Sequence, residues 1–248
     1  MFDHADLLLG LSRALAENPR ADRWPALCRA AVRGLRVDDG SIALSVAGVP
    51  EMLCASSRRA AAYGQAQEIC GEGPVHDVLA TSAPVLVTGG DGDLRRWPRL
   101  GALYGTVEAG PVVAVPMTAQ PTEVVGVLTI HHGLRSSLGR HLHGGSDEAR
   151  ADALADVLFV ADTLGAVVLA DTFLPEDEQL RWIDRDRVAQ AVGMVVAQTG
   201  GTPEDALALI RARAFADGVT VAEVSRRVVS RELDLGRGEG GPDGSGPR

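Results

Sequence analysis

Apolar positions in the last third of the chain recur at helical spacing in three separate runs. Their spacing of three to five residues is that of one buried face of an amphipathic helix. Glycines that suit helix ends separate the runs, at Gly200-Gly201 and at Gly218. The pattern therefore predicts a bundle of three short helices. The positions expected on the buried faces are Leu180, Ile183, Val188, Ala191, Val195 and Gln198, then Leu207, Ile210 and Ala214, then Val221, Val224, Val228 and Leu233.

Capping signals mark the starts of the second and third predicted helices. Thr202 is a good N-cap, Pro203 suits the first helical position, and Asp205 places an acid near the positive end of the helix dipole. Thr220 with Glu223 three residues later forms a capping-box pattern. These signals predict where the helices begin but not what the bundle does, because a bundle used only for dimerisation would have the same spacing.

Residues 1 to about 172 mix amphipathic stretches with short runs rich in β-formers. Strands near both ends, with helices between them, predict an antiparallel sheet flanked by helices, an α+β fold. A hairpin turn is expected at 120–122 and a loose loop at 133–145. The predicted helices are 2–17, 23–36, 58–69 and 74–80, and the predicted strands are 41–47, 51–56, 84–88, 112–117 and 124–131.

A longer helix is predicted between the two regions, beginning at Ser146 as N-cap. Its apolar positions repeat at intervals of 3, 4, 3 and 4, which predicts a coiled-coil dimer seam of about two heptads. A helix that faces the core of the preceding sheet would show the same pattern, and the two readings are compatible. The seam positions are Leu154, Val157, Ala161, Leu164 and Val168.

The expected organisation is a domain at 1–172, with the connecting helix at 146–172, and a helical domain at 173–235. The tail 236–248 has six glycines and two prolines and is expected to be disordered. We find no apolar run of transmembrane length and no secretory leader, so a soluble, cytoplasmic protein without membrane contact is expected. The three scattered cysteines fit a reducing compartment.

Every basic residue is arginine, because the chain contains no lysine. This excludes a phosphate-binding Walker loop, a Schiff-base enzyme and a protein kinase, all of which need a lysine. It also argues against a phospho-accepting receiver domain. No motif places a catalytic set, and the four histidines at 131–132, 141 and 143 lack a carboxylate or cysteine at useful spacing. We therefore expect no enzyme activity, no metal and no cofactor.

The run 187–194, R-V-A-Q-A-V-G-M, followed by T-P-E-D-A-L and the third helix, resembles the ANTAR domain, a three-helix RNA-binding module of bacterial antiterminators. The resemblance implies binding of structured RNA hairpins. Many ANTAR domains carry lysine before the motif glycine, where this chain has Val192. From Glu176 to Leu235 there are eight arginines and eleven acidic residues, so the RNA surface must be local. The nominated RNA contacts are Arg185, Arg187, Gln190, Ala191, Gly193, Arg211, Arg213, Arg226 and Arg227.

The G-E-G-P turn at 71–74, the P-V-L-V strand and the A-V-P-M strand leading to V-G-V-L-T resemble a GAF domain. GAF domains are sensory modules that bind small molecules or form dimers. Cys70, Glu72 and His76 are weak candidates for ligand contact, although the turn needs no ligand. Together the two resemblances, similar to actinobacterial members, imply a homodimeric regulator that receives a small molecule or an upstream signalling protein and controls termination or translation.

Three alternatives remain from the sequence. A sensory or scaffold dimer with a degenerate output would bind no RNA. A GAF-type enzyme, such as a methionine-sulfoxide reductase, would need reactive thiols at Cys54 and Cys70. DNA binding is disfavoured by the acidic balance.

Overall fold

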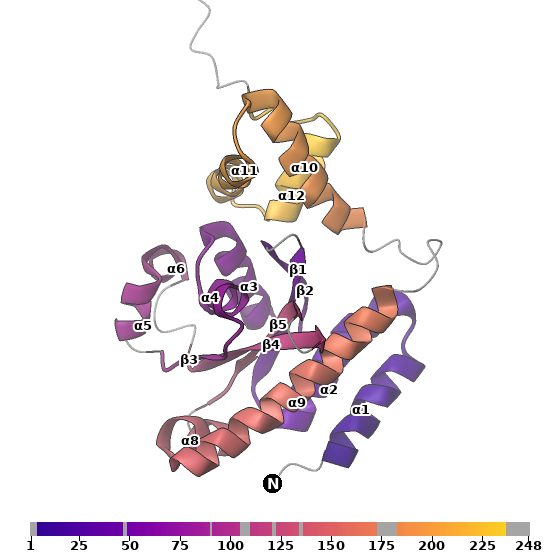
Figure 1. The fold of residues 1–248 in the computed structure, drawn as a ribbon, viewed down its shortest axis with the longest axis vertical. Helices are drawn as coiled ribbons and strands as arrows, with labels where there is room; N and C mark the ends of the chain where they lie inside the picture. Colours follow the sequence, from indigo (N-terminus) through magenta and orange to yellow (C-terminus); the bar gives the residue numbers. More distant parts are fainter. Residues whose placement is uncertain are drawn as a thin grey trace, which may run out of the picture. The chain divides into compact units, whose positions relative to one another are not determined.

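The computed structural model describes residues 4–46, 49–89, 91–104, 110–120, 123–133, 136–172 and 183–236. The chain divides into two compact units, Met1–Glu178 and Gln179–Arg248. Figure 1 shows the sheet-containing unit in indigo to salmon and the helical unit in orange to yellow. Each unit is described by itself below.

The N-terminal unit is built on a five-stranded sheet in the order β2-β1-β5-β4-β3. Every neighbouring pair is antiparallel, which confirms the α+β class and the antiparallel sheet predicted from the sequence. The elements are α1 His4–Glu17, α2 Arg20–Leu35, β1 Asp39–Val46, β2 Val49–Ala55, α3 Arg58–Cys70, α4 Pro74–Thr81, β3 Val85–Val87, α5 Asp91–Arg96, α6 Pro98–Tyr104, β4 Val112–Gln120, β5 Glu123–His131, α8 Ser137–Gly144 and α9 Asp147–Thr172.

The sheet is covered on both faces, and the side chains of β4 alternate between the two cores. Val113, Val115 and Met117 lie in the core with α1, α2, α8 and α9. Val112 and Ala114 lie in the other core, with α3, α4 and α6. In Figure 1, α2 and α9 lie on one side of the strands and α3 and α4 on the other. The apolar run of β4 is therefore explained by burial on both faces.

Helix α9 lies directly against β4, and Gly165 allows the close approach. A Cβ atom at this position would lie 2.6 Å from the carbonyl oxygen of Thr118. The side-chain hydroxyl of Thr118 also donates a hydrogen bond to Asp162, one turn earlier on the helix. The backbone of α9 is thus fixed against the sheet by contact and by a hydrogen bond.

The stripe predicted as a dimer seam faces the sheet of its own domain. Val157, Ala161 and Leu164 are wholly buried in the core, Val168 is buried, and Leu154 packs against the same core. The core-facing alternative therefore describes this stripe, and a pairing surface on α9 would have to use another face. The predicted N-cap is present, because the Ser146 hydroxyl accepts a hydrogen bond from the Ala149 amide at 3.2 Å.

The segment Asp147–Ala170 of α9 is long and apolar enough to cross a membrane, by length and composition. The sequence expectation that no run reaches this length and composition is therefore wrong. It is the one helix of the described residues with this length and composition. A core helix of a globular domain can have the same length and composition. One stripe of α9 is buried against the sheet of its own domain, and several of its other apolar side chains are half-buried.

Three short helices were not predicted. The loop expected at 133–145 contains α8, where the Ser136 hydroxyl accepts from the Gly139 amide at 2.9 Å and Leu138 and Leu142 are buried. The glycines and histidines of this segment hid a spacing of four between the two leucines. Helices α5 and α6 were missed because each is one to two turns long and carries little periodic signal. The predicted turn residues 121–122 lie outside the described residues.

The C-terminal unit consists of α10 Ile183–Thr199, α11 Pro203–Asp217 and α12 Val221–Val229, as the sequence predicted. The Thr202 hydroxyl accepts from the Asp205 amide at 3.2 Å, and the Asp205 carboxylate accepts in return from the Thr202 amide at 3.0 Å. Thr220 caps α12 through the Glu223 amide at 3.1 Å. Apart from Gly236, the predicted tail lies outside the described residues. The buried core comprises Val188, Ala191, Val195, Ala206, Leu207, Ile210, Ala214, Val221, Val224 and Val228. The expectation that Gln198 lies on the buried face of α10 is wrong, because its side chain is exposed, and Leu233 is only half-buried.

Candidate functional site

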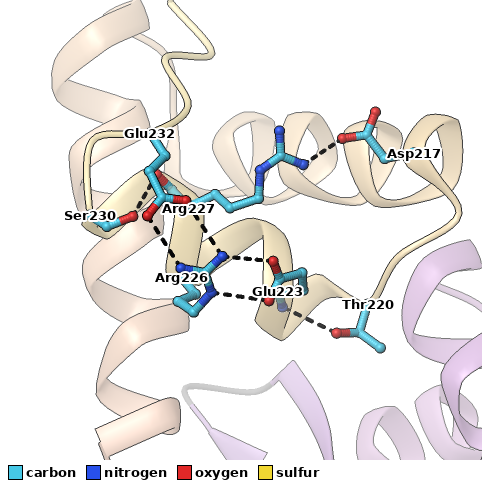
Figure 2. A network of polar contacts seen from close by, with 7 residues as sticks. All are labelled: Asp217, Thr220, Glu223, Arg226, Arg227, Ser230 and Glu232. Atoms are coloured by element: carbon cyan, nitrogen blue, oxygen red, sulfur yellow. Dashed lines mark hydrogen bonds and ion pairs between the residues drawn. The ribbon is translucent and has the colours of Figure 1, made fainter.

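The arginines of α11 and α12 are joined through one carboxylate. Asp217, the last residue of α11, accepts from Arg213 Nε at 2.9 Å and from Arg227 Nη1 at 2.7 Å. These two hydrogen bonds hold the pKa of Asp217 below its ordinary value, with the Arg213 bond the larger cause. Figure 2 shows Arg227 reaching across from α12 to Asp217. Two guanidinium groups from different helices are therefore held next to each other.

A second cluster surrounds Arg226 on α12. Its Nη2 donates to Glu223 at 2.8 Å, and its Nη1 donates to Glu232, beyond the helix end, at 3.3 Å (Figure 2). The hydrogen bond from Arg226 lowers the pKa of Glu223, and the Glu223 and Glu232 carboxylates raise the pKa of Arg226. The Glu223 side chain thus binds Arg226, and α12 is capped by the Thr220 side chain.

The nominated contacts on α10 fall into different environments. Gln190 and Gly193 are exposed, and Arg187 is half-buried. Ala191 is wholly buried, so its nomination as a direct RNA contact is wrong; it belongs to the helix-packing core. The apolar spacing of this helix places Ala191 among its core positions, and the nomination as an RNA contact came only from the motif resemblance. Arg185 lies in α10, but its side chain is outside the described residues.

The acidic partners of these arginines were not anticipated as part of the site. Asp217 lies four residues after Arg213, and Arg226 lies three residues after Glu223, spacings that bring side chains together on a helix. That signal was present in the sequence. The contacts of Arg227 with Asp217 and of Arg226 with Glu232 depend on how the chain turns between helices, which the spacing does not give.

The nominated ligand contacts of the N-terminal unit all have partners within the fold. Glu72 accepts hydrogen bonds from the amides of Arg99 and Leu100, at 2.5 and 3.0 Å, and so caps the first turn of α6. His76 Nε2 lies 3.0 Å from the carbonyl oxygen of Gln67, and Cys70 is buried. Buried Gln67 accepts from the Val75 amide at 2.9 Å, which fixes the turn between α3 and α4. These contacts explain the turn without a ligand.

A buried histidine pair lies elsewhere in this unit. The rings of His132 and His143 stack with centroids 5.1 Å apart, and neither ring nitrogen of His132 has a hydrogen-bond partner among the described residues. Burial, and then the neighbouring His143 and His131, lower the pKa of His132 to about 4. In the described part of the chain, no group of three or more histidine, cysteine, aspartate or glutamate side chains could hold a metal ion.

The cysteines have none of the features of reactive thiols. All three are buried, and the pKa of Cys54 is raised by a hydrogen bond with the Cys28 thiol and by burial. Burial also raises the pKa of Cys70. Because the thiolate is the nucleophile, raised pKa values disfavour the thiol chemistry that a methionine-sulfoxide reductase requires.

Comparison with known families explains this two-unit organisation. The GAF domain family matches residues 20–168, and the ANTAR domain family matches residues 180–229. The chain belongs to the GAF domain family and carries an ANTAR domain. The GAF match spans α2 to α9, and the ANTAR match spans nearly all of the three-helix bundle.

Among solved structures, the GAF domain of A. aeolicus nlh2 in an inactive state is similar to this chain at 13% identity, with a TM-score of 0.44. The similarity covers 65% of this chain and 91% of that one. No curated protein matches the sequence significantly. ANTAR domains are RNA-binding antiterminator modules and GAF domains are sensory modules that bind small ligands or dimerise. The GAF–ANTAR chain is thus a signal-responsive regulator with an RNA-binding output.

Proposed function

We propose that this GAF–ANTAR protein acts as a cytoplasmic homodimer that binds structured RNA hairpins in transcripts and so controls termination or translation. The observation that carries the proposal is the ANTAR match, which falls on a bundle of three helices with arginines on each. The GAF domain would receive the signal, either a small molecule or an upstream signalling protein. Its output would be the RNA affinity of the paired ANTAR domains. We propose domain limits of 1–172 and 173–235 for this division of labour.

The RNA surface we propose uses Arg187, Gln190 and Gly193 of α10 with the arginines of α11 and α12. Arg213 and Arg227 support it most directly, because Asp217 holds both guanidinium groups within 3 Å of one carboxylate. A phosphate group approaching this pair meets two positive charges already in place, at the cost of one shared negative charge. The same arrangement limits non-specific attraction, which suits recognition of RNA shape more than binding to duplex DNA.

For the signal path, we propose that α9 carries a change in the sheet of the GAF domain towards the ANTAR domain. It is fixed on β4 at Gly165 and Thr118, and the chain continues from it into the ANTAR domain. A ligand or partner that changes the packing of α9 on the sheet would change the spacing of two ANTAR domains in a dimer. Dimer contacts would use faces of the GAF domain other than the buried stripe of α9.

The first experiment is crosslinking and immunoprecipitation of the protein from its host, with sequencing of the bound RNA. We expect enrichment of paired hairpins near transcript starts or ribosome-binding sites. An expressed, dimeric protein that enriches no RNA, with and without stress signals, would contradict the proposal.

The surface is tested by reversing charge at Arg187→Glu with Arg213→Glu. We expect loss of RNA binding by at least tenfold with an unchanged circular dichroism spectrum. The matched control is Arg13→Glu with Arg58→Glu, which makes the same charge change at two exposed arginines of the GAF domain. If the two double variants bind RNA equally, net charge and not the proposed surface governs affinity.

A sensory or scaffold dimer without RNA output is the second candidate. The acidic partners of Arg213, Arg226 and Arg227 favour it, because each of these arginines already has a carboxylate within 3 Å. The RNA experiments above separate the two candidates, since a scaffold would bind neither hairpin nor duplex.

A further inference from the structure

Helix α11 is apolar on two opposite faces. One face holds Ala206, Leu207, Ile210 and Ala214, which are buried in the bundle core. The other face is exposed, although it carries no charged residue over two turns. We name it the apolar α11 face; it consists of Ala208, Leu209, Ala212, Phe215 and Ala216.

The most exposed large side chain on this face is aromatic. Phe215 is 60% exposed and Leu209 is 40% exposed. Residues three and four apart lie next to each other on a helix, so the members of this face form one continuous strip. A single exposed apolar residue is ordinary, but a contiguous apolar strip on a domain surface marks a binding site.

The borders of the strip indicate its occupant. Arg211 lies four residues before Phe215, and Arg213 lies four residues after Leu209, so a guanidinium group stands on each side of the strip. Arg213 is held in place by Asp217 at 2.9 Å. An aromatic ring between cationic groups matches an unpaired nucleotide, whose base stacks on the ring while its phosphates meet the guanidinium groups.

We propose that the apolar α11 face binds unpaired bases of RNA, with Phe215 as the stacking platform. The inference rests on the proposed RNA-binding function and adds the surface that reads the loop. It also accounts for an RNA-binding domain in which Arg213, Arg226 and Arg227 are already paired with acidic side chains. Base stacking draws affinity from the ring and needs no net positive charge.

The test uses the full chain and a pool of RNA hairpins with one fixed stem and a randomised loop. Phe215→Ala removes the ring, Phe215→Leu keeps an apolar side chain without a ring, and Phe215→Tyr keeps the ring. We expect the first two to weaken binding about 10- to 100-fold and the third to bind like the wild type. The slope of affinity against salt should be unchanged in all three, because no ionic contact is lost.

Two controls locate the effect. Leu103→Ala removes another exposed large apolar side chain, from α6 of the GAF domain, and should leave hairpin binding unchanged. A blunt duplex of the same stem, which has no unpaired base, should bind the wild type and Phe215→Ala equally. In Phe215→Trp, the added indole fluorescence should be quenched by the hairpin pool, whereas the native tryptophans of the wild type should change little.

Each contrary result has a distinct meaning. If wild type binds hairpins and Phe215→Ala binds them equally well, the stacking inference is overturned and the proposed function stands. If the wild type binds no hairpin, both fail. If Phe215→Ala and Phe215→Leu convert a dimer to a monomer in analytical ultracentrifugation while hairpin affinity per chain is unchanged, the face pairs two copies of the chain, and the inference is wrong.

Discussion

Helices α9 and α11 both carry apolar residues around much of their circumference, but they differ in how much of that apolar surface their own domain buries. Neither separates apolar from polar residues cleanly around its axis. In α9 the largest apolar side chains pack within their own domain: the stripe at Val157 and Leu164 faces the sheet, and the ring of Phe159, which is half-buried, stacks on His4 of α1 with ring centroids 4.3 Å apart. In α11 the second apolar face, with Phe215, lies open. The apolar content of a helix therefore predicts that its surface is buried by something, but only the packing shows whether its own domain buries it.

The largest expected effect is the loss of stability when a leucine of α9 is replaced by alanine, compared with the same replacement in α11. Leu164→Ala should lower the free energy of unfolding of the GAF domain by about 2 to 5 kcal/mol, because a wholly buried side chain leaves a cavity. Leu209→Ala should change the ANTAR domain by no more than about 0.5 kcal/mol. Urea unfolding followed by circular dichroism measures both. Equal losses would mean that the apolar α11 face is covered in solution.

The buried histidine pair of the GAF domain should make its stability depend on pH. The pKa of His132 is about 4 in the folded domain and 6.5 when unfolded, so only the unfolded chain takes up this proton as pH falls from 6.5 to 4. Stability is therefore full above pH 6.5 and falls by at most about 3 kcal/mol towards pH 4. In His132→Leu this loss should be smaller. The same replacement at exposed His141 should leave the pH profile of the wild type intact.

Two helical glycines give a matched pair with opposite signs. Gly165→Ala places a methyl group 2.6 Å from the Thr118 carbonyl oxygen and should destabilise the GAF domain by about 1 to 3 kcal/mol. Gly193→Ala meets nothing within 4 Å and should stabilise the ANTAR domain by about 0.5 to 1 kcal/mol. Melting temperatures of the two domains measure the effect. A destabilised Gly193→Ala would indicate a contact at α10 that only a partner copy supplies.

The smallest effect is expected at Asp217. Hydrogen bonds from Arg213 and Arg227 lower its folded pKa, so its contribution is present above its ordinary value of 3.8 and is lost as pH falls through the lower folded value. Asp217→Asn should therefore melt slightly below wild type at pH 7, and the difference should shrink as pH falls below 3.8. Added salt should narrow the difference at pH 7. A difference in melting temperature that does not shrink as the pH is lowered would assign the loss to packing.

Local signals in the sequence predicted much of this fold. The Thr202 and Thr220 hydroxyls cap α11 and α12 as expected, because an N-cap acts on residues next to it in the chain. The β-strands and the glycine at the end of α11 were likewise predictable. Helix α8 was missed because its core contacts, Leu138 and Leu142, lie among glycines and histidines that are typical of a loop.

The candidate site was less predictable because burial and cross-helix pairing are tertiary properties. Ala191 and Gln190 were both nominated from the motif, yet Ala191 is in the core, as the apolar spacing of the helix predicted, and Gln190 is in solvent. Phe215 gave no signal of its own, since an apolar residue at helical spacing is usually buried. Its exposure follows from the packing of α11, because the opposite face of the helix supplies the residues that the bundle core buries.

The carboxylate shared by Arg213 and Arg227 has a consequence for genetics. Loss of either arginine leaves Asp217 with its other partner, so the remaining guanidinium stays anchored in nearly the same place. The two positions should therefore be epistatic, with mild single alleles and a severe double allele. A screen of single substitutions would therefore miss both residues. An orthologue could lose one of the two arginines with little effect, and selection would then act only against loss of the second.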